Sequence, residues 1–454
     1  MPVLHFQYPD NSPWAPMIRY VLEVLSRHPL APPDLVIRHR PTPEPGDIAI
    51  VYGGAEPADP SAWFIPACRL IFADEATGLL NLQAQVYTHA DRRLYALAQT
   101  PSAEPLPFVQ DRHFGFDLIE TLFFHLSRYE EYHCPAEWKN EHGEMISEYH
   151  YLVRHGLQRQ PVADHIVWSF YKALGLEPAT PSPCYQLSHD LDELEKFRFP
   201  WRFPRQVAKF LLLKGNLSAV CRLSRSFFDC QMGWGKDPYD NLDRLLQSGL
   251  DGHKTLYLLV NSQARFDPPD VPDTQTLLDI IELARERGYR IGLHPSYDTW
   301  KDPDLWRREW DWLSHLTGSA VDCSRQHYLH LSFPETLDIL EAMGIAEDAS
   351  LGYNDLVGFR CGTGFAYPLY HFQEGRPYRF LEQPLVVMDS ALLQESRYQP
   401  GPMEQIWQEV VEANRHFTRI AFNFHNSRFD DAWLNGLDLW SYLFRVSQDG
   451  GKPD

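Results

Sequence analysis

The feature that most constrains the fold is an alternation of short apolar runs with amphipathic stretches between residues 185 and 424. The runs predict β-strands, and apolar residues at helical spacing over 277–284 and 335–343 predict helices between them. Strands that alternate with helices favour parallel pairing, with the helices packed outside the sheet. About 270 residues of this pattern fit a (β/α) barrel, complete or distorted. The expected strands are 185–188, 256–260, 289–293, 385–388 and 420–424.

A proline-rich segment precedes the barrel pattern. Residues 178–183 contain three prolines, which continue neither a helix nor a central strand. We therefore expect an α/β chain with a linker at 178–183 between a smaller N-terminal domain, 1–177, and a barrel, 184–454.

The N-terminal domain is predicted to be α/β or α+β. Apolar runs at 35–37, 47–52 and 70–72 predict strands, and apolar residues at helical spacing between Ile119 and Tyr129 predict a helix. No group of residues in this domain has a spacing that predicts a reaction.

Composition limits the partners that this chain is expected to have. Its 41 basic and 61 acidic residues give a net charge of −20, which repels phosphate backbones and anionic lipid, so neither nucleic acid nor a membrane surface is predicted as a partner. Seven widely spaced cysteines without a CxxC pair favour a reducing compartment. The sequence begins without a signal-peptide pattern and contains no integral membrane segment, so we expect a cytoplasmic protein.

Carboxylate or imidazole side chains follow four of the predicted barrel strands. In such barrels the reactive side chains lie at the carboxyl ends of the strands. Each residue alone has a structural interpretation, as a helix cap, a turn residue or a buried hydrogen-bonded histidine. Together they predict a functional centre that contains Asp190 and Asp192, His294 and Asp298, Asp389, and His425.

Oxygen and imidazole ligands without thiolate favour zinc or another divalent first-row ion. Of two aspartates separated by one residue, one can bind the ion while the other accepts a proton from the attacking water. A histidine across the mouth of the barrel can then protonate the leaving group.

The barrel region, about 184–430, resembles the polysaccharide deacetylase family, which comprises carbohydrate esterases with a NodB-homology barrel. The segment His189-Asp190-Leu191-Asp192 resembles the first family motif, which implies that Asp190 is the catalytic base and Asp192 a metal ligand. The segment that begins at His294 resembles the family's metal motif, which implies that His294 is a second ligand.

The resemblance extends to the later family motifs. Arg325-Gln326-His327-Tyr328 resembles the arginine motif, so Arg325 is expected to orient the base. Phe424-His425 resembles the last motif, so His425 is expected to be the general acid, with Asp389 tuning it. Substrate contacts are expected from Tyr297 and Arg360. The segment 116–132 resembles an uncharacterised domain found before the barrel in a bacterial subgroup of these proteins.

One position departs from the family pattern, because Asp298 stands where the family has its second metal histidine. Three outcomes follow: a site in which Asp192, His294 and Asp298 hold the ion with an altered preference, a site completed by another group such as His327, or a site that binds no metal. Zinc is the expected ion.

Three functions fit the sequence. The first is a metal-dependent hydrolase that removes an acetyl group from an N- or O-acetylated carbohydrate, in surface polysaccharide metabolism. The second is an inactive deacetylase-like protein that binds carbohydrate or acts as a scaffold. The third, ranked last, is a glycosidase that uses Asp190 and Asp192, because carboxyl groups two residues apart rarely flank a glycosidic bond.

Overall fold

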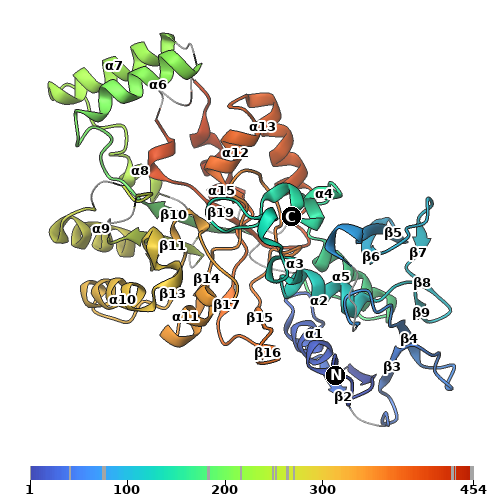
Figure 1. The fold of residues 1–454 in the computed structure, drawn as a ribbon. Helices are drawn as coiled ribbons and strands as arrows, with labels where there is room; N and C mark the ends of the chain where they lie inside the picture. Colours follow the sequence, from blue (N-terminus) through green and yellow to red (C-terminus); the bar gives the residue numbers. More distant parts are fainter. Residues whose placement is uncertain are drawn as a thin grey trace. The chain divides into compact units, whose positions relative to one another are not determined.

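The computed structural model shows a mixed α/β chain that forms two compact units, which we describe separately (Figure 1). The first unit comprises Met1–Pro181, Gly358–Pro384 and Asn414–Arg419; the second comprises Ser182–Val357, Leu385–Ala413 and Ile420–Asp454. Residues 181–184, at the end of the expected linker, lie outside the part of the chain that the structure describes. The described residues are 2–39, 42–73, 78–180, 185–214, 217–247, 250, 253–261, 265–268, 271–430, 434 and 436–449.

The first unit is built on a sheet whose strands run in the order β2-β1-β3-β4-β9-β8. Its central strands are parallel, with Leu4 opposite both Ile37 and Ile48. The strands are β1 (Val3–Gln7), β2 (Val36–His39), β3 (Ile48–Gly53), β4 (Trp63–Pro66), β8 (Val109–Gln110) and β9 (His113–Phe114). A second sheet, in the order β6-β5-β7, contains β5 (Gln83–His89), β6 (Arg92–Ala98) and β7 (Leu106–Pro107).

The predicted strand at 70–72 is wrong. The backbone N–H groups of Leu70, Ile71 and Phe72 donate hydrogen bonds of 3.1, 2.6 and 2.6 Å to the buried carboxylate of Glu120. Glu120 lies in the first turn of α2 (Leu118–Leu126), whose N-cap Asp117 accepts the N–H of Glu120. This carboxylate satisfies donors that a neighbouring strand would otherwise have to accept.

The predicted helix that reaches Tyr129 is interrupted. Arg128 has a left-handed backbone with φ +57° and separates α2 from α3 (Tyr129–Tyr132). The remaining elements of the first unit are α1 (Ala15–Arg27), α4 (Tyr151–Arg154), α5 (Val162–Ala173), and the antiparallel pair β15 (Tyr370–His371) and β16 (Arg376–Pro377).

The second unit is built on a sheet in which its strands run in the order β14-β13-β12-β11-β10-β19-β18. The paired strands are parallel, as the alternation of strands and helices predicts. Parallel pairing places the carboxyl ends of these strands at one edge of the sheet. The strands are β10 (Tyr185–Leu191), β11 (Lys254–Leu259), β12 (Arg290–His294), β13 (Cys323–Ser324), β14 (Glu347–Asp348), β18 (Val387–Met388) and β19 (Ile420–Asn423).

Helices follow most of these strands, and the expected helices at 277–284 and 335–343 correspond to α9 and α11. None of the described helices is long and apolar enough to cross a membrane. The helices of the second unit are α6 (Arg202–Lys214), α7 (Leu217–Gln231), α8 (Leu242–Leu245), α9 (Thr274–Glu286), α10 (Pro303–Thr317), α11 (Glu335–Met343), α12 (Asp389–Glu395), α13 (Pro400–Trp407) and α15 (Leu439–Asp449).

Gly292 in β12 allows the close packing that positions one candidate site residue. A Cβ atom at Gly292 would lie 2.5 Å from the ring of Tyr257 and 3.0 Å from the Sγ of Cys323. Without that atom, the Tyr257 ring packs against β12 and faces the guanidinium of Arg325, 4.4 Å from the ring centre. A side chain at position 292 would therefore displace the ring that supports Arg325.

Candidate metal and active site

Asp190 lies near the carboxyl end of β10, where both of its carboxylate oxygens accept hydrogen bonds. Oδ1 accepts from Arg325 Nη1 at 2.9 Å, and Oδ2 accepts from Asn423 Nδ2 at 2.8 Å. Arg325 follows β13 directly, and its Nε donates to the carbonyl of Ala349 at 2.9 Å. Both Asp190 and Arg325 are buried. The predicted orientation of Asp190 by Arg325 therefore has a direct geometric basis.

The surroundings of Asp190 favour its ionised form. Burial works to raise its pKa, but the positive charges of Arg325, His294 and His425 outweigh burial and hold the pKa below its ordinary value. A buried carboxylate that stays ionised at neutral pH and sits beside two imidazoles can act as a proton acceptor.

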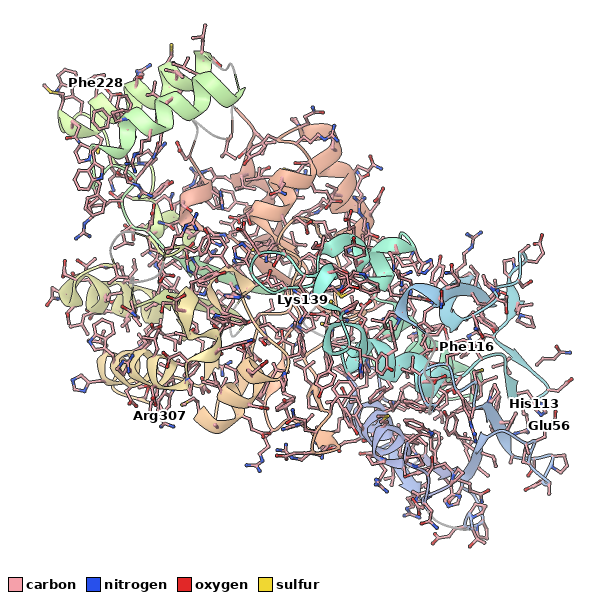
Figure 2. The ribbon with its side chains drawn as sticks, viewed as in Figure 1. Glu56, His113, Phe116, Lys139, Phe228 and Arg307 are labelled. Carbon is pink, nitrogen blue, oxygen red and sulfur yellow. The ribbon has the colours of Figure 1, made fainter. Side chains whose placement is uncertain are left out.

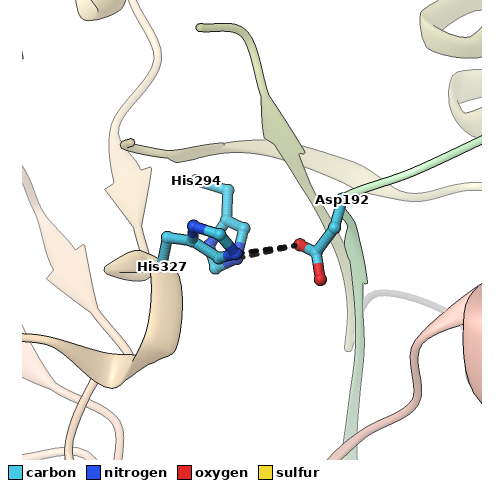
Figure 3. Close-up of side chains that lie close together, drawn as sticks. All are labelled: Asp192, His294 and His327. Atoms are coloured by element: carbon cyan, nitrogen blue, oxygen red, sulfur yellow. Dashed lines mark ion pairs between the residues drawn. The ribbon is translucent and has the colours of Figure 1, made fainter. Parts of the chain in front are cut away.

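Three ligand atoms converge beside Asp190, on Asp192, His294 and His327 (Figure 3). The Nε2 atoms of His294 and His327 lie 3.3 and 4.0 Å from Asp192 Oδ1, and all three ligand atoms lie within 4.8 Å of one another. Asp192 follows β10, His294 is the last residue of β12, and His327 begins the short helix η5 (His327–Leu329). The carboxyl ends of neighbouring parallel strands thus assemble this group.

The second ring nitrogen of each histidine is already engaged. His294 Nδ1 lies 2.6 Å from the carbonyl oxygen of Arg325, and His327 Nδ1 lies 2.9 Å from Asp267 Oδ1. Since both partners are acceptors, each Nδ1 carries the proton, and each neutral ring turns the lone pair of Nε2 toward Asp192. Hydrogen bonds of this kind fix the tautomer that a metal-binding histidine needs.

The group requires positive charge at its centre. Asp192 Oδ1 is buried and accepts no hydrogen bond from the residues that the structure describes. Although burial opposes the shift, the two imidazoles lower the pKa of Asp192, and the carboxylates of Asp190 and Asp192 raise the pKa of His294. Two imidazoles and one carboxylate with an open side fit a divalent ion such as zinc.

The structure places Asp298 outside this group. Pro295 follows the last residue of β12, and the chain then turns into the short helix η4 (Tyr297–Lys301), on which Asp298 is exposed. His327, whose backbone N–H donates to the carbonyl of Pro295 at 3.2 Å, occupies the third position instead. Of the arrangements that the sequence left open, the one completed by His327 is the arrangement with converging atoms.

His425 and Asp389 form a pair on the other side of Asp190. His425 Nδ1 lies 2.7 Å from Asp389 Oδ1, and the backbone N–H of His425 donates to Asp389 Oδ2 at 2.7 Å. His425 Nε2 lies 3.7 Å from Asp190 Oδ2. Burial favours the neutral ring, but the Asp389 carboxylate outweighs it and raises the pKa of His425 to about 9. The ring is therefore protonated at neutral pH.

The two residues expected to contact substrate lie elsewhere. Tyr297 is buried, with its ring stacked on His330 at 4.3 Å. Arg360 belongs to the first unit, where its guanidinium donates to Glu131 at 2.6 Å. Near the metal-ligand group, Tyr328 is the more accessible aromatic side chain, with 47% of its surface exposed and its ring 4.8 Å from that of His327.

Sequence reasoning missed two supporting residues. Asn423 lies within β19, opposite Ser188 of β10, so its side chain reaches Asp190 from the neighbouring strand. The strand register, which the sequence pattern does not give, determines this contact. Asp267 lies in a loop after β11, where its only signal is that it is an aspartate between two predicted elements.

Similarity to known proteins is confined to part of the chain. A family model described as a family of unknown function, DUF7033, matches residues 8–177. No curated protein matches the chain. One similar solved structure is described as a "putative polysaccharide deacetylase from Mycobacterium smegmatis"; the match covers 59% of this chain and 85% of that one, at 12% identity and a TM-score of 0.34. The function is therefore inferred from the side chains of this protein itself.

Proposed function

We propose that the second unit is a metal-dependent hydrolase that removes an acetyl group from an acetylated carbohydrate. The observation that carries this proposal is the position of Asp190 between a candidate ligand group and a protonated histidine. A proton acceptor, a cation site and a proton donor then share one strand-end edge. The resemblance of the sequence to polysaccharide deacetylase motifs supports the choice of an acetylated sugar as substrate.

Asp192, His294 and His327 are proposed to hold the ion, most simply Zn²⁺. A divalent ion in this position polarises the acetyl carbonyl and lowers the pKa of a water molecule. Asp267 fixes the ring of His327 from behind, and the carbonyl of Arg325 fixes the ring of His294.

Proton transfer is divided between two residues. Asp190, ionised and oriented by Arg325 and Asn423, accepts the proton of the water that attacks the acetyl carbon. His425, protonated and held by Asp389, donates a proton to the nitrogen or oxygen that leaves. Tyr328, exposed beside His327, is proposed to contact the sugar, because sugar rings pack well on aromatic faces.

The proposal is tested by incubating the purified full chain, loaded with Zn²⁺, with N- and O-acetylated mono- and oligosaccharides and assaying free acetate. We expect acetate and an equal amount of the deacetylated sugar. Release of new reducing ends without acetate would replace the proposal with glycoside cleavage. A protein that binds the sugars but leaves the acetyl groups intact with every divalent ion would contradict it.

The protonation of His425 predicts the alkaline side of the pH profile. The acid form is present below its pKa of about 9, so kcat/KM is expected to fall as pH rises through that value. The variant Asp389→Asn removes the charge that raises the pKa, so this fall should shift to lower pH by about one unit or more. Acetate release between about pH 6 and 10 measures both profiles. An alkaline limb at the same pH in both proteins would remove His425 from its proposed role.

A further inference from the structure

The helical hairpin of α6 and α7 differs in charge from the rest of the chain. Residues 196–236 contain nine basic residues and one acidic residue, a net charge of +8, which leaves −28 for the remaining residues. Ion pairs neutralise part of this charge, since Arg202 pairs with Glu193 and Arg225 with Asp229. Arg205 is exposed, and 85% of the Arg225 side chain is accessible. The net charge of the whole chain therefore hides a basic segment.

The same hairpin exposes large apolar side chains. Six of the eleven exposed large apolar residues in the described part of the chain lie between positions 201 and 234. Trp234 and Trp201 are 75% and 63% exposed, and Phe228, 58% exposed, lies at the outer edge of the hairpin (Figure 2). The other three are Leu211, Leu217 and Met232.

These side chains are not required for packing within the hairpin. A separate small core of Phe197, Ala219 and Leu223, with partly buried neighbours, already joins the helices. Phe203 at the start of α6 stacks on Phe227 near the end of α7 with ring centres 4.2 Å apart, so the two helices run antiparallel. The exposed residues are therefore additional to a hairpin that is already packed.

We propose that the hairpin formed by α6 and α7 binds the surface of an anionic lipid membrane. Lysine and arginine beside exposed Trp, Phe and Leu on amphipathic helices is the composition of segments that lie in the membrane interface. The basic groups are attracted to anionic headgroups, and tryptophan favours the depth of the headgroups. The acidic remainder of the chain opposes non-specific adsorption, so binding depends on the hairpin.

Charge and side-chain type favour a membrane over two other partners. Two copies of the hairpin facing each other would bring like charges together. Nucleic acid recognition by exposed side chains relies on aromatic stacking, whereas Leu211, Leu217 and Met232 have no ring to stack. Aliphatic and aromatic side chains together match the acyl–headgroup boundary of a bilayer.

Flotation of the full chain with vesicles tests the proposal. We expect the protein to float with vesicles of phosphatidylcholine containing about 30 mol% phosphatidylserine, not with phosphatidylcholine alone, and to dissociate as salt is raised. Substitution of Trp201, Phe228 and Trp234 by serine should lower the partition coefficient at least tenfold. The pair Arg205→Glu and Arg225→Glu should lower it by about a hundredfold, since four units of charge are reversed.

The matched control reverses the same number of charges on another exposed helix, with Arg307→Glu and Arg308→Glu on α10 (Figure 2); this variant should bind as the wild type does. Circular dichroism and thermal unfolding verify the fold of each variant, and the charge pair decides the matter if the serine variant does not fold. The proposal is overturned if the wild type does not float, or if both hairpin variants float as it does. It is also overturned if the hairpin instead mediates self-association in sedimentation velocity or binds a single-stranded oligonucleotide.

Discussion

The variant Asp190→Asn is expected to lose acetate release by about 10³-fold or more while it still binds Zn²⁺. An amide cannot accept the proton of the attacking water, and a well-placed general base contributes about 10²–10⁴ in rate. Since the ligands proposed for the ion are Asp192, His294 and His327, the metal content should remain near one ion per chain. Single-turnover acetate release, measured beside metal analysis of the same preparation, separates the two properties.

Asp192→Asn is the matched control for Asp190→Asn. It makes the same chemical change two residues away and is expected to lose both the ion and activity, because it removes a proposed ligand. Thermal unfolding establishes that the loss of charge beside the buried Arg325 has not unfolded the protein. Acetate release in Asp190→Asn at nearly the wild-type rate, with zinc bound, would show that another group accepts the proton.

The sequence predicted the elements that bring Asp190, Asp192 and His294 together. Buried parallel strands appear as short apolar runs, and the polar residues that follow them interrupt those runs clearly. Strand order then determines which ends are neighbours. β10 lies between β11 and β19 in the sheet, so the ends of strands far apart in sequence meet at one edge.

The third candidate ligand could not be chosen from the sequence. Asp298 follows His294 at the spacing of a helical turn, but Pro295 and the short helix η4 remove that geometry. His327 reaches the group because the chain after β13 turns sharply, with Tyr328 and Leu329 both at positive φ. Left-handed backbone at tyrosine and leucine has no sequence signal, since neither residue favours it.

Net charge was a poor guide to partners. A total of −20 argues against anionic surfaces only if charge is spread evenly along the chain. The segment 196–236 is basic and exposes both of its tryptophans. Exposure of those side chains depends on how α6 and α7 pack, which helical periodicity alone does not reveal.

The second large effect is expected in metal affinity. Alanine at Asp192, His294 or His327 removes one of three proposed ligands and should weaken Zn²⁺ binding by about a hundredfold or more. Asp267→Ala should weaken it by about 10- to 100-fold, because Asp267 orients the ring of His327 without touching the ion. Asp298→Ala, which removes an exposed carboxylate outside the group, should leave the affinity within about twofold of the wild type.

The measurement that tests the account most directly is a Zn²⁺ titration by calorimetry of the wild type, His327→Ala and Asp298→Ala. The account predicts one ion per chain in the wild type and in Asp298→Ala, and strongly weakened binding in His327→Ala. Strong binding in His327→Ala with loss in Asp298→Ala would contradict it, as would a wild-type chain that takes up no divalent ion.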